Sequence, residues 1–529
     1  MHHHLSVIVI VAVVGSLTTL AQVIPVGPAG PRVGPSYEVR VVISSSADLD
    51  ALTRSGYNIG SVDETTATVY ATAEELLWLQ MDGYTLAEVK PHPAEPFAKS
   101  GARGLGVYHT YADLTNELQA YASAHPDICR LTSLGKTAQN RDLWALLITD
   151  NPDEDEFEPE LRYISTMHGD EPVGTEMCLY FIDYLLSKYG SNKRVTRLVN
   201  RTAIWIVPLM NPDGFQAGTR WNSNGIDLNR NFPTWPEDIT GTVFDGTPLD
   251  TSGRQLEVQH IMNWSAANSF TLAANFHTGA LLVNYPYDDD DKGSGNYAAS
   301  PDDELFRDIS LRYAMPNTPM YTNPVPSFPN GIVNGSLWYE ITGGMQDWSY
   351  RYLGCNEVTI ELSSTKIPNE NTLAGFWSDN RDSMLSFAEA ADIGARGFVR
   401  DKATGQPLYA EVKVVGNART VFTDPDLGDY HRMLLPGTYT LKFSAPGYKS
   451  KLVRDVVVGS GRATKVNAKL KPVTLKTDVN GDGKTNSVDL QLVTLAVLGT
   501  QPTLKADVNG SGEVDATDLQ YVVNVICGR

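Results

Sequence analysis

The sequence has few cysteines and an excess of negative charge for its length. Four cysteines occur in 529 residues, and no two of them form a CxxC pair: Cys129, Cys178, Cys355 and Cys527. So few and scattered cysteines exclude a disulfide-rich scaffold and a CxxC metal motif. Lys and Arg total 42 against 62 Asp and Glu, a net charge of −20. This balance argues against nucleic acid or an anionic membrane as a partner.

Long apolar runs are also lacking after residue 21, so no later segment is expected to span a bilayer. Residues 1–21 combine an apolar stretch with small residues near Ala21, which favours a cleaved signal peptide and a secreted protein. The segment has no Lys or Arg, and a membrane anchor is the alternative interpretation. Residues 22–36 are rich in Pro and Gly and predict a linker without helix or central strand.

Residues 37–92 predict a small α+β unit, and order is expected to begin near Tyr37. Apolar patterning within it indicates two strands and two helices. The strands are expected over 37–43 and 67–71, and the helices over 47–55 and 73–81.

Residues 108–393 alternate apolar strands with helical segments. Strands such as 143–148 and 202–207 are apolar throughout, and residues 176–188 have a helical pattern. Alternation of this kind indicates an α/β sheet with helices on both faces. Residues 394–471 carry short strand patterns separated by turn signals, which predict a small β-sandwich.

A possible metal site is indicated by His168, Glu171 and His277. His168 and Glu171 would share one side of a helical turn, so that an imidazole nitrogen and a carboxylate oxygen could bind one cation. His168 and His277 each follow an apolar strand, and strand ends in α/β sheets border the crevice that holds ligands. Each histidine alone could be a hydrogen-bonded core residue, but the set favours a metal. Two His and one Glu leave an open fourth position, as in catalytic zinc sites.

Seven sequence blocks, in order, resemble the M14 family of zinc metallocarboxypeptidases, and most closely the regulatory branch with carboxypeptidases N, E and D. The blocks are HGDEP at 168–172, NPDG at 211–214, DLNRNFP at 227–233, ANFHTG at 274–279, YPYD at 285–288, WYEITGGMQD at 338–347 and EVTIEL at 357–362. The resemblance implies an enzyme that hydrolyses the last peptide bond of peptide or protein C-termini. It also implies an α/β/α catalytic domain with a mixed eight-stranded sheet at 108–393, followed by a transthyretin-like β-sandwich at 394–471.

The resemblance also assigns catalytic roles. It implies one catalytic Zn²⁺ bound by His168, Glu171 and His277, with Asp227 orienting a ligand imidazole. Glu361 matches the carboxylate that takes a proton from water and delivers it to the leaving amine. From the residues alone, Glu357 competes with Glu361 because strand residues four apart share a face. A helix cap is the alternative role for Asp227.

Substrate-binding roles follow from the same resemblance. Arg230 matches the residue that binds the terminal carboxylate, since a planar guanidinium meets both oxygens. Asn229 and Tyr339 match its helpers, and Arg220 matches the group that stabilises the oxyanion.

The side-chain pocket would contain Asp288 with Gln346 as its polar companion. A buried acid pairs with a basic side chain, so release of C-terminal Arg or Lys is expected. A different side-chain preference is one alternative, and a catalytically inactive binding module that keeps the fold is another. Residues 289–291 are expected to be a solvated acidic loop rather than further metal ligands. The unit at 37–92 could be a pro-region that covers the active site or an inert domain.

The last unit, residues 474–529, contains a repeat that starts at Asp478 and again 29 residues later at Asp507. Oxygen-bearing side chains recur at the loop positions that calcium needs, with a Gly at the sharp turn, and each loop runs into a helical pattern. The first loop offers Asp478, Asn480, Asp482, Asn486 and Asp489, and the second Asp507, Asn509, Ser511, Asp515 and Asp518. A turn-rich repeat without metal is the alternative to two Ca²⁺ ions.

A loop and helix duplicated without an entering helix resemble a type I dockerin, which implies a cohesin-type scaffold protein as partner. The residues before each final Asp, 487–488 and 516–517, do not form the matched polar pairs that such recognition often uses. Calcium is therefore better supported than cohesin.

Overall fold

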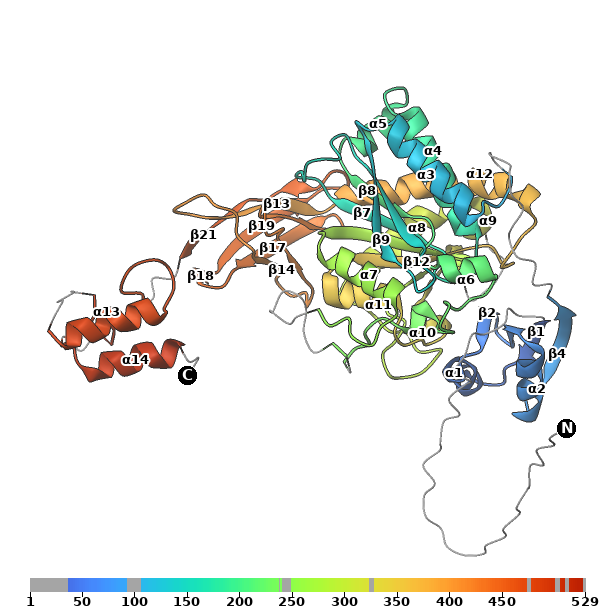
Figure 1. Cartoon of the computed structure of the whole chain (residues 1–529), viewed down its shortest axis with the longest axis horizontal. Coiled ribbons are helices and arrows are strands. Elements are labelled where there is room, and N and C mark those ends of the chain that lie inside the picture. Colours follow the sequence, from blue (N-terminus) through green and yellow to red (C-terminus); the bar gives the residue numbers. More distant parts are fainter. Residues whose placement is uncertain are drawn as a thin grey trace, which may run out of the picture.

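The structure, a computed structural model, describes eight segments of the chain (Figure 1): 37–92, 106–236, 238–239, 249–322, 328–472, 477–499, 505–509 and 513–526. The predicted signal peptide at 1–21, the linker at 22–36 and the ligand Ser511 lie outside the described residues.

An eight-stranded mixed sheet forms the centre of the large unit (Figure 1), and this part of the prediction is confirmed. The strand order is β11-β10-β12-β9-β7-β8-β6-β5. The four neighbours β12, β9, β7 and β8 are parallel, whereas β10 and β6 join them antiparallel. The strands are β5 (Cys129–Lys136), β6 (Asp142–Ile148), β7 (Glu160–Ser165), β8 (Ala203–Val207), β9 (Phe270–His277), β10 (Leu281–Tyr285), β11 (Ile332–Asn334) and β12 (Asn356–Leu362).

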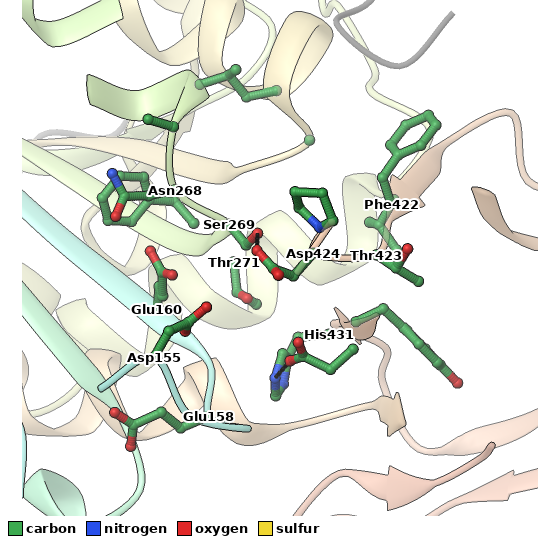
Figure 2. A pocket seen from close by; sticks show the side chains of 18 of the residues that line it. Asp155, Glu158, Glu160, Asn268, Ser269, Thr271, Phe422, Thr423, Asp424 and His431 are labelled. Atoms are coloured by element: carbon green, nitrogen blue, oxygen red, sulfur yellow. Dashed lines mark hydrogen bonds and ion pairs between the residues drawn. The ribbon is translucent and has the colours of Figure 1, made fainter. Parts of the chain in front are cut away.

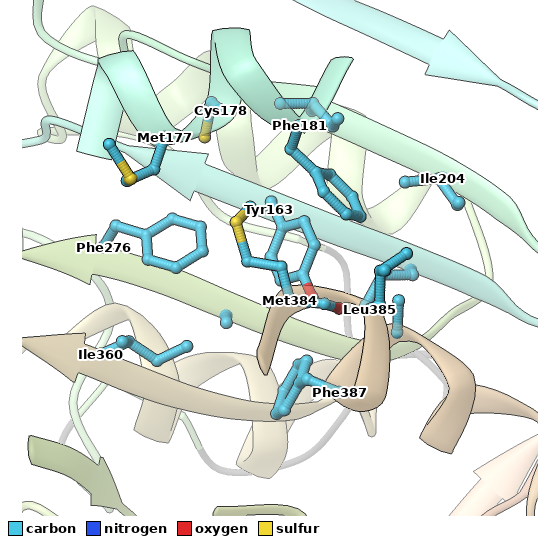
Figure 3. Packing of buried hydrophobic residues seen from close by; sticks show 14 of the residues in the cluster. Tyr163, Met177, Cys178, Phe181, Ile204, Phe276, Ile360, Met384, Leu385 and Phe387 are labelled. Carbon is cyan, nitrogen blue, oxygen red and sulfur yellow. The ribbon is translucent and has the colours of Figure 1, made fainter. Parts of the chain in front are cut away.

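Helices cover both faces of this sheet, because alternate residues of its central strands are apolar on each side. In β8, Ile204 and Ile206 belong to one buried cluster, and Trp205 and Val207 to the other. Figure 3 shows the first cluster, in which Tyr163 packs among residues of α4 and α12. The helices of the unit are α3 (Tyr111–Ala124), α4 (Val173–Lys188), α5 (Lys193–Val199), α6 (Pro212–Ala217), α7 (Leu256–Ala266), α8 (Asp303–Ala314), α9 (Thr318–Tyr321), α10 (Gly335–Trp338), α11 (Met345–Trp348) and α12 (Leu373–Glu389).

Five short helical turns connect these elements. They are η1 (Leu228–Arg230), η2 (Pro329–Gly331), η3 (Ser349–Leu353), η4 (Glu370–Thr372) and η5 (Ala390–Asp392).

The N-terminal unit is a four-stranded antiparallel sheet of order β2-β3-β1-β4 with two helices. Its elements are β1 (Tyr37–Val42), α1 (Ser46–Arg54), β2 (Asn58–Val62), β3 (Thr66–Ala71), α2 (Ala73–Met81) and β4 (Leu86–Pro91). Sequence patterning did not predict β2 or β4. Both lack the apolar alternation of a half-buried strand, since β2 contains Asn, Gly and Ser and β4 is largely exposed.

After the large unit, two sheets share one apolar core and form the predicted β-rich unit. One sheet contains β13 (Ala395–Asp401), β16 (Asp429–Arg432), β18 (Tyr448–Lys449), β20 (Thr464–Lys465) and β21 (Ala468–Pro472). The other contains β14 (Glu411–Val414), β15 (Thr420–Phe422), β17 (Gly437–Ser444) and β19 (Lys451–Val458). Two helices follow, α13 (Ser487–Val497) and α14 (Ala516–Ile526), and each begins directly after a repeat loop.

In the described part of the chain, no helix combines the length and the apolar character needed to cross a membrane. Cys129, Cys178 and Cys355 are buried and unpaired there, so they act as small apolar core residues.

Candidate active site

The central parallel strands bring the predicted metal ligands to one edge of the sheet. His168 follows β7, and His277 is the last residue of the adjacent strand β9. Because β7 and β9 are parallel, their carboxyl ends meet at the same edge. The predicted helical turn for His168 and Glu171 is wrong. Both lie in a turn before α4, closed by the Glu171 N–H donating to the His168 carbonyl at 3.1 Å.

The three side chains converge on one point. Glu171 Oε2 lies 3.1 Å from His168 Nδ1 and 2.9 Å from His277 Nδ1, and the two Nδ1 atoms are 3.0 Å apart. A tetrahedral zinc with bonds of about 2.0–2.1 Å holds its ligand atoms about 3.3 Å apart. All three side chains are buried. Two imidazole nitrogens that face each other across a buried carboxylate are the donor set of a cation, so these residues fit zinc.

Asp227 contacts His168 at Nε2, the ring nitrogen that does not face Glu171. Its Oδ1 lies 3.1 Å from His168 Nε2 and also accepts the Asn229 N–H at 2.8 Å. Asp227 is thus both the imidazole partner and the cap of η1, the two roles that the sequence left open. Burial raises the pKa of Asp227, but Arg220 and His168 outweigh it and hold that pKa well below its usual value.

Glu361 and Glu357 lie at opposite ends of β12 and have different surroundings. Glu357 is fully buried in an ion pair with Arg162, 2.7 Å away, and its other oxygen accepts from Asn275 at 2.9 Å. Glu361 pairs in register with His277, lines the cavity at the metal ligands, and its Oε2 has no hydrogen-bond partner among the described residues. Burial and Glu171 raise the pKa of Glu361 well above its usual value.

Two arginines border the same cavity. Arg220 Nη1 lies 3.1 Å from His168 Nδ1 and 3.4 Å from Glu171 Oε1, and its Nε donates to Asp227 at 2.9 Å. Arg230 lies on η1, and its Nη1 donates to the backbone carbonyl of Asn229 at 3.0 Å.

Asn229 and Tyr339 line the same cavity as the two arginines. Asn229 Oδ1 accepts the Met345 N–H at 3.0 Å, which joins η1 to α11. Tyr339 directly follows α10, and burial raises its pKa to about 12. The structure therefore brings three predicted substrate-binding residues, Arg230, Asn229 and Tyr339, to the cavity that holds Glu361.

Asp288 and Gln346 lie side by side in the same cavity region, although they are far apart in sequence. Gln346 Nε2 donates to Asp288 Oδ1 at 2.6 Å, and Asn284 Nδ2 donates to the same oxygen at 3.2 Å. Asp288 is buried, and burial together with Asp347 raises its pKa well above its usual value. None of these contacts places a cation beside Asp288, so its ionised carboxylate has no counter-charge among them.

The acidic loop beside it is only partly solvated, so one prediction is corrected. Asp289 is buried, and its carboxyl lies against that of Glu340. Burial and Asp289 raise the pKa of Glu340 to about 7. Asp290 pairs with Lys292, and Asp291 is exposed as predicted.

Two further residues of this centre were not predicted, Lys366 and Asn58. Lys366 Nζ is fully buried and lies 3.1 Å from Glu171 Oε1, 2.8 Å from Asp170 Oδ2 and 2.9 Å from Asn58 Oδ1. Burial raises the pKa of Glu171, but His168 and Lys366 outweigh it and hold that pKa well below its usual value. No spacing rule joins a lysine after β12 to an asparagine in the N-terminal unit, so the sequence carried no signal for either.

The N-terminal unit covers this site through β2. Asn58 Nδ2 also donates to Asp170 Oδ2 at 3.2 Å. The backbone of Gly60 lies very close to Gly279: a Cβ added to Gly279 would lie 2.4 Å from the Gly60 carbonyl oxygen. With β2 in place the cavity retains about 20 Å³, which is room for about one water molecule. The unit's apolar core continues into the large unit through Ala280, Leu282, Phe328, Val333 and Trp338.

The first repeat loop gathers carboxylates as calcium would require. One oxygen each of Asp478, Asp482 and Asp489 lies within 4.8 Å of the others. Asp489 is buried, and its Oδ1 accepts the backbone N–H of Val479 at 2.8 Å. Asn480 and Asn486 lie in the same loop, with Asn486 as the cap of α13.

The second loop repeats this geometry. Asp518 Oδ1 accepts the Val508 N–H at 2.9 Å and its Oδ2 the Asp515 N–H at 3.0 Å, as Asp489 does with Val479 and Asn486. Asp507 and Asn509 precede it in the described part of the loop.

Three family models match successive parts of the chain. The model described as Peptidase_M14, zinc carboxypeptidase, matches residues 114–383. A carboxypeptidase regulatory-like domain matches residues 394–471, and a dockerin type I domain matches residues 476–526.

Among similar proteins, human carboxypeptidase D is 41% identical over 394 residues, which cover 71% of this chain and 28% of that protein. The catalytic chain of mouse carboxypeptidase N is 36% identical over 394 residues, covering 69% of this chain and 86% of that protein. The crystal structure of carboxypeptidase A from Helicoverpa armigera matches with a TM-score of 0.53 at 19% identity, over 68% of this chain and 98% of that chain. The last match supports the fold alone.

Proposed function

Because the chain belongs to the M14 family of zinc carboxypeptidases, we propose that it is a secreted metallocarboxypeptidase that releases C-terminal Arg or Lys from peptides and proteins. The main support is the convergence of His168, His277 and Glu361 from three adjacent parallel strands on a cavity that also contains Arg230 and Asp288. The apolar segment at 1–21 and the dockerin match support secretion.

His168, Glu171 and His277 would hold the zinc, with Asp227 fixing the orientation of the His168 ring. Bound zinc supplies Lewis-acid chemistry, which acidifies water and polarises a carbonyl. Glu361 would take the proton of the attacking water on Oε2, its free oxygen, and pass it to the leaving amine. The raised pKa of Glu361 suits a group that must hold a proton between these two transfers.

The two arginines would each bind a different negatively charged group of the substrate. Arg230, which lines the same cavity, would pair with the terminal carboxylate, which limits cleavage to the last bond. Arg220, beside the metal ligands, would stabilise the negative charge that develops on the scissile carbonyl oxygen. Asn229 and Tyr339 would donate further hydrogen bonds to the terminal carboxylate.

Asp288 would select the side chain that is released. Gln346 and Asn284 hold its Oδ1 in place, and Thr359 in turn donates to Gln346 Oε1 at 2.9 Å. A C-terminal Arg or Lys would supply the missing cation, whereas an apolar side chain would leave a buried acid without one.

Product analysis tests this function. Peptides that end in Arg, Lys or Leu are incubated with the protein, and the released amino acid is measured with a zinc chelator and after zinc is added back. Release of only the terminal Arg or Lys, lost with the chelator and restored by zinc, is expected. Release of internal fragments, or hydrolysis that persists after the metal is removed, contradicts the proposal.

We further propose that residues 37–92 are a pro-region that blocks the site until it is removed. The support is the position of β2, whose Asn58 reaches Arg220, Lys366 and Asp170, and the small volume left beneath it. A peptide cannot enter a space of about 20 Å³.

Cleavage within the connecting segment 93–105, followed by removal of the N-terminal unit, is expected to raise kcat/KM at least tenfold. Asn58→Ala should raise the activity of the uncleaved protein, because it removes hydrogen bonds to charged groups that hold β2 in place. Ser61→Ala is the matched control in the same strand, since the Ser61 hydroxyl donates to Thr68 within the unit. Equal kcat/KM before and after removal would identify the unit as inert.

The repeat loops are proposed to bind two Ca²⁺ ions and to present α13 and α14 to a cohesin-type partner. Ca²⁺ would neutralise Asp478, Asp482 and Asp489, which otherwise repel one another. Chelation of calcium is expected to lower hydrogen-exchange protection in α13 and α14 and to leave the β12 amides unchanged. Unaltered protection of both helices would count against calcium.

A further inference from the structure

A second cavity lies between the large unit and the β-sandwich, away from the active site. Its volume is about 390 Å³, within the range of small-molecule sites. Glu160 and Phe270, the first residues of β7 and β9, line it, whereas His277 ends β9 at the active site. At roughly 3.3 Å per residue, the length of β9 separates the two sites by about 23 Å.

Carboxylates from both units converge on this cavity (Figure 2). The segment before β7 and the start of β7 contribute four of them, and the β15–β16 region contributes two: Asp155, Glu156, Glu158, Glu160, Asp424 and Asp429. Among the described residues that line it there is no Lys or Arg. Like charges that share a cavity repel one another, and either protonation of the acids or a bound cation relieves that repulsion.

The pKa values of these groups reflect their burial first and the neighbouring negative charges second. Burial raises the pKa of Asp155 to about 6, with further contributions from Asp424 and Asp429. Burial likewise raises the pKa of Glu158 to about 7 and that of Glu160 to about 8.

Independently of the charge, buried polar atoms in the cavity wall lack partners among the described residues. Glu160 Oε2 has no hydrogen bond there, and neither has Oδ1 of Asp429, which is 6% exposed. The His431 side chain is 7% exposed, and neither of its ring nitrogens has a hydrogen bond, although Nε2 lies 3.3 Å from Asp429 Oδ2. Figure 2 shows His431 among Asp155, Glu158 and Asp424. Buried groups of this kind normally bind protein, water or a ligand.

The dimensions and the walls of the cavity indicate the class of ligand. Among the described residues, the groups of ligand atoms close enough to hold a metal ion lie in the active site and in the first repeat loop, and this cavity contains none of them. Phe422 and Tyr409, whose rings stack on each other, also line the cavity. Aromatic rings and carboxylates together suit an alkyl chain that carries a positive charge.

We propose that this cavity binds an organic cation, an ammonium or guanidinium group on an aliphatic stem. The cation donates to the free oxygens of Glu160 and Asp429 and to His431, while its stem lies against Phe422 and Tyr409. It contacts both the large unit and the sandwich, so it stabilises their junction. The ligand is either a free amine or a basic side chain of another polypeptide, since both present the same chemistry.

Affinity should increase with pH. The acids that face the cation, Asp155, Glu158 and Glu160, lose their protons between about pH 6 and 8, while the guanidinium stays charged. Other titratable groups that line the cavity are Glu156, Asp424, Asp429, His431, Tyr409 and Tyr430. Three cations lie nearby: Arg396 and Lys465 lie over the ring of Phe157, and Arg419 lies next to Gly354.

Calorimetric titration of the full chain with agmatine tests the proposal. Agmatine has a guanidinium and an amine on an aliphatic stem but no carboxylate for Arg230, so it is a poor ligand for the active site. One molecule per chain is expected to bind more tightly at pH 8.5 than at pH 5.5. Affinity should fall at least tenfold in the Asp155→Asn/Glu160→Gln variant and in Asp429→Asn. Asp153→Asn, in the same segment and 86% exposed, should have no effect.

A second arm uses a peptide with one internal Arg and an amidated C-terminus. Tighter binding of agmatine identifies a free amine as the source of the cation, and tighter binding of the peptide identifies a basic side chain. No saturable binding of either probe, or affinities that the cavity substitutions leave unchanged, overturns the proposal. Binding of Mg²⁺ alone that depends on the same residues also overturns it, because the cavity is then a metal site.

Discussion

Glu361→Gln is expected to lower kcat for hydrolysis of a C-terminal Arg by about 10²- to 10⁴-fold, the usual contribution of a general acid–base group. Glutamine keeps the shape of the side chain but cannot accept a proton from water. Zinc content should not change, because His168, Glu171 and His277 are the proposed ligands and Glu361 is not one of them. The measurement combines steady-state kinetics after removal of the N-terminal unit with metal analysis of the purified variant.

Glu357→Gln distinguishes catalysis from folding. Glu357 pairs with the fully buried Arg162, so its loss leaves a buried charge without a partner and should destabilise the fold by about 3–5 kcal/mol. Folded molecules of this variant should keep kcat within a few fold of the parent, as should the partly exposed control Glu370→Gln. If Glu361→Gln were active and folded Glu357→Gln were inactive, the assignment of the base would be reversed.

Asp288→Asn is expected to lower kcat/KM for peptides ending in Arg by roughly 10²- to 10⁴-fold. The amide cannot pair with a guanidinium, so a cation entering the pocket would lose its water without gaining a partner, a cost of about 3–5 kcal/mol. Asparagine also removes a buried acid with a raised pKa, which should leave the fold intact. Peptides ending in Leu should be cleaved as well as before, or better.

Asp290→Asn provides the matched control, because Asp290 lies in the same loop and pairs only with the exposed Lys292. Its ratio of kcat/KM for Arg over Leu should equal that of the parent. An unchanged ratio in Asp288→Asn would show that another group selects the side chain.

The large unit was predictable because its strands are apolar throughout and alternate with helices, a pattern that local sequence determines. The small strand β2 was not predictable, since Asn58 and Gly60 have no strand pattern of their own. They form a strand because β3 pairs with them and the rim of the large unit buries them. Tertiary contacts of this kind override local propensity.

Candidate site residues divide in the same way. His168, Glu171 and His277 could be found from the sequence because donor chemistry and strand ends are both local features. Lys366 could not, because a lysine becomes part of a metal centre only when Asp170 and Glu171 surround it. The cavity with His431 was equally hidden, since its acids come from two units that meet only after folding.

The sequence by itself determined which side chains are available for chemistry: the zinc donors, the arginines, Asp288 and the oxygens of the repeat loops. The residues alone did not distinguish Glu357 from Glu361; the family resemblance favours Glu361, and the tertiary structure supplies a physical reason for that preference. Strand periodicity puts both residues on one face of β12. The Glu357 carboxylate is buried in an ion pair with Arg162, whereas Glu361 lies next to His277 and its Oε2 has no hydrogen-bond partner among the described residues. The fold also decided that β2 lies over the site, because contacts between distant segments depend on packing and not on local pattern.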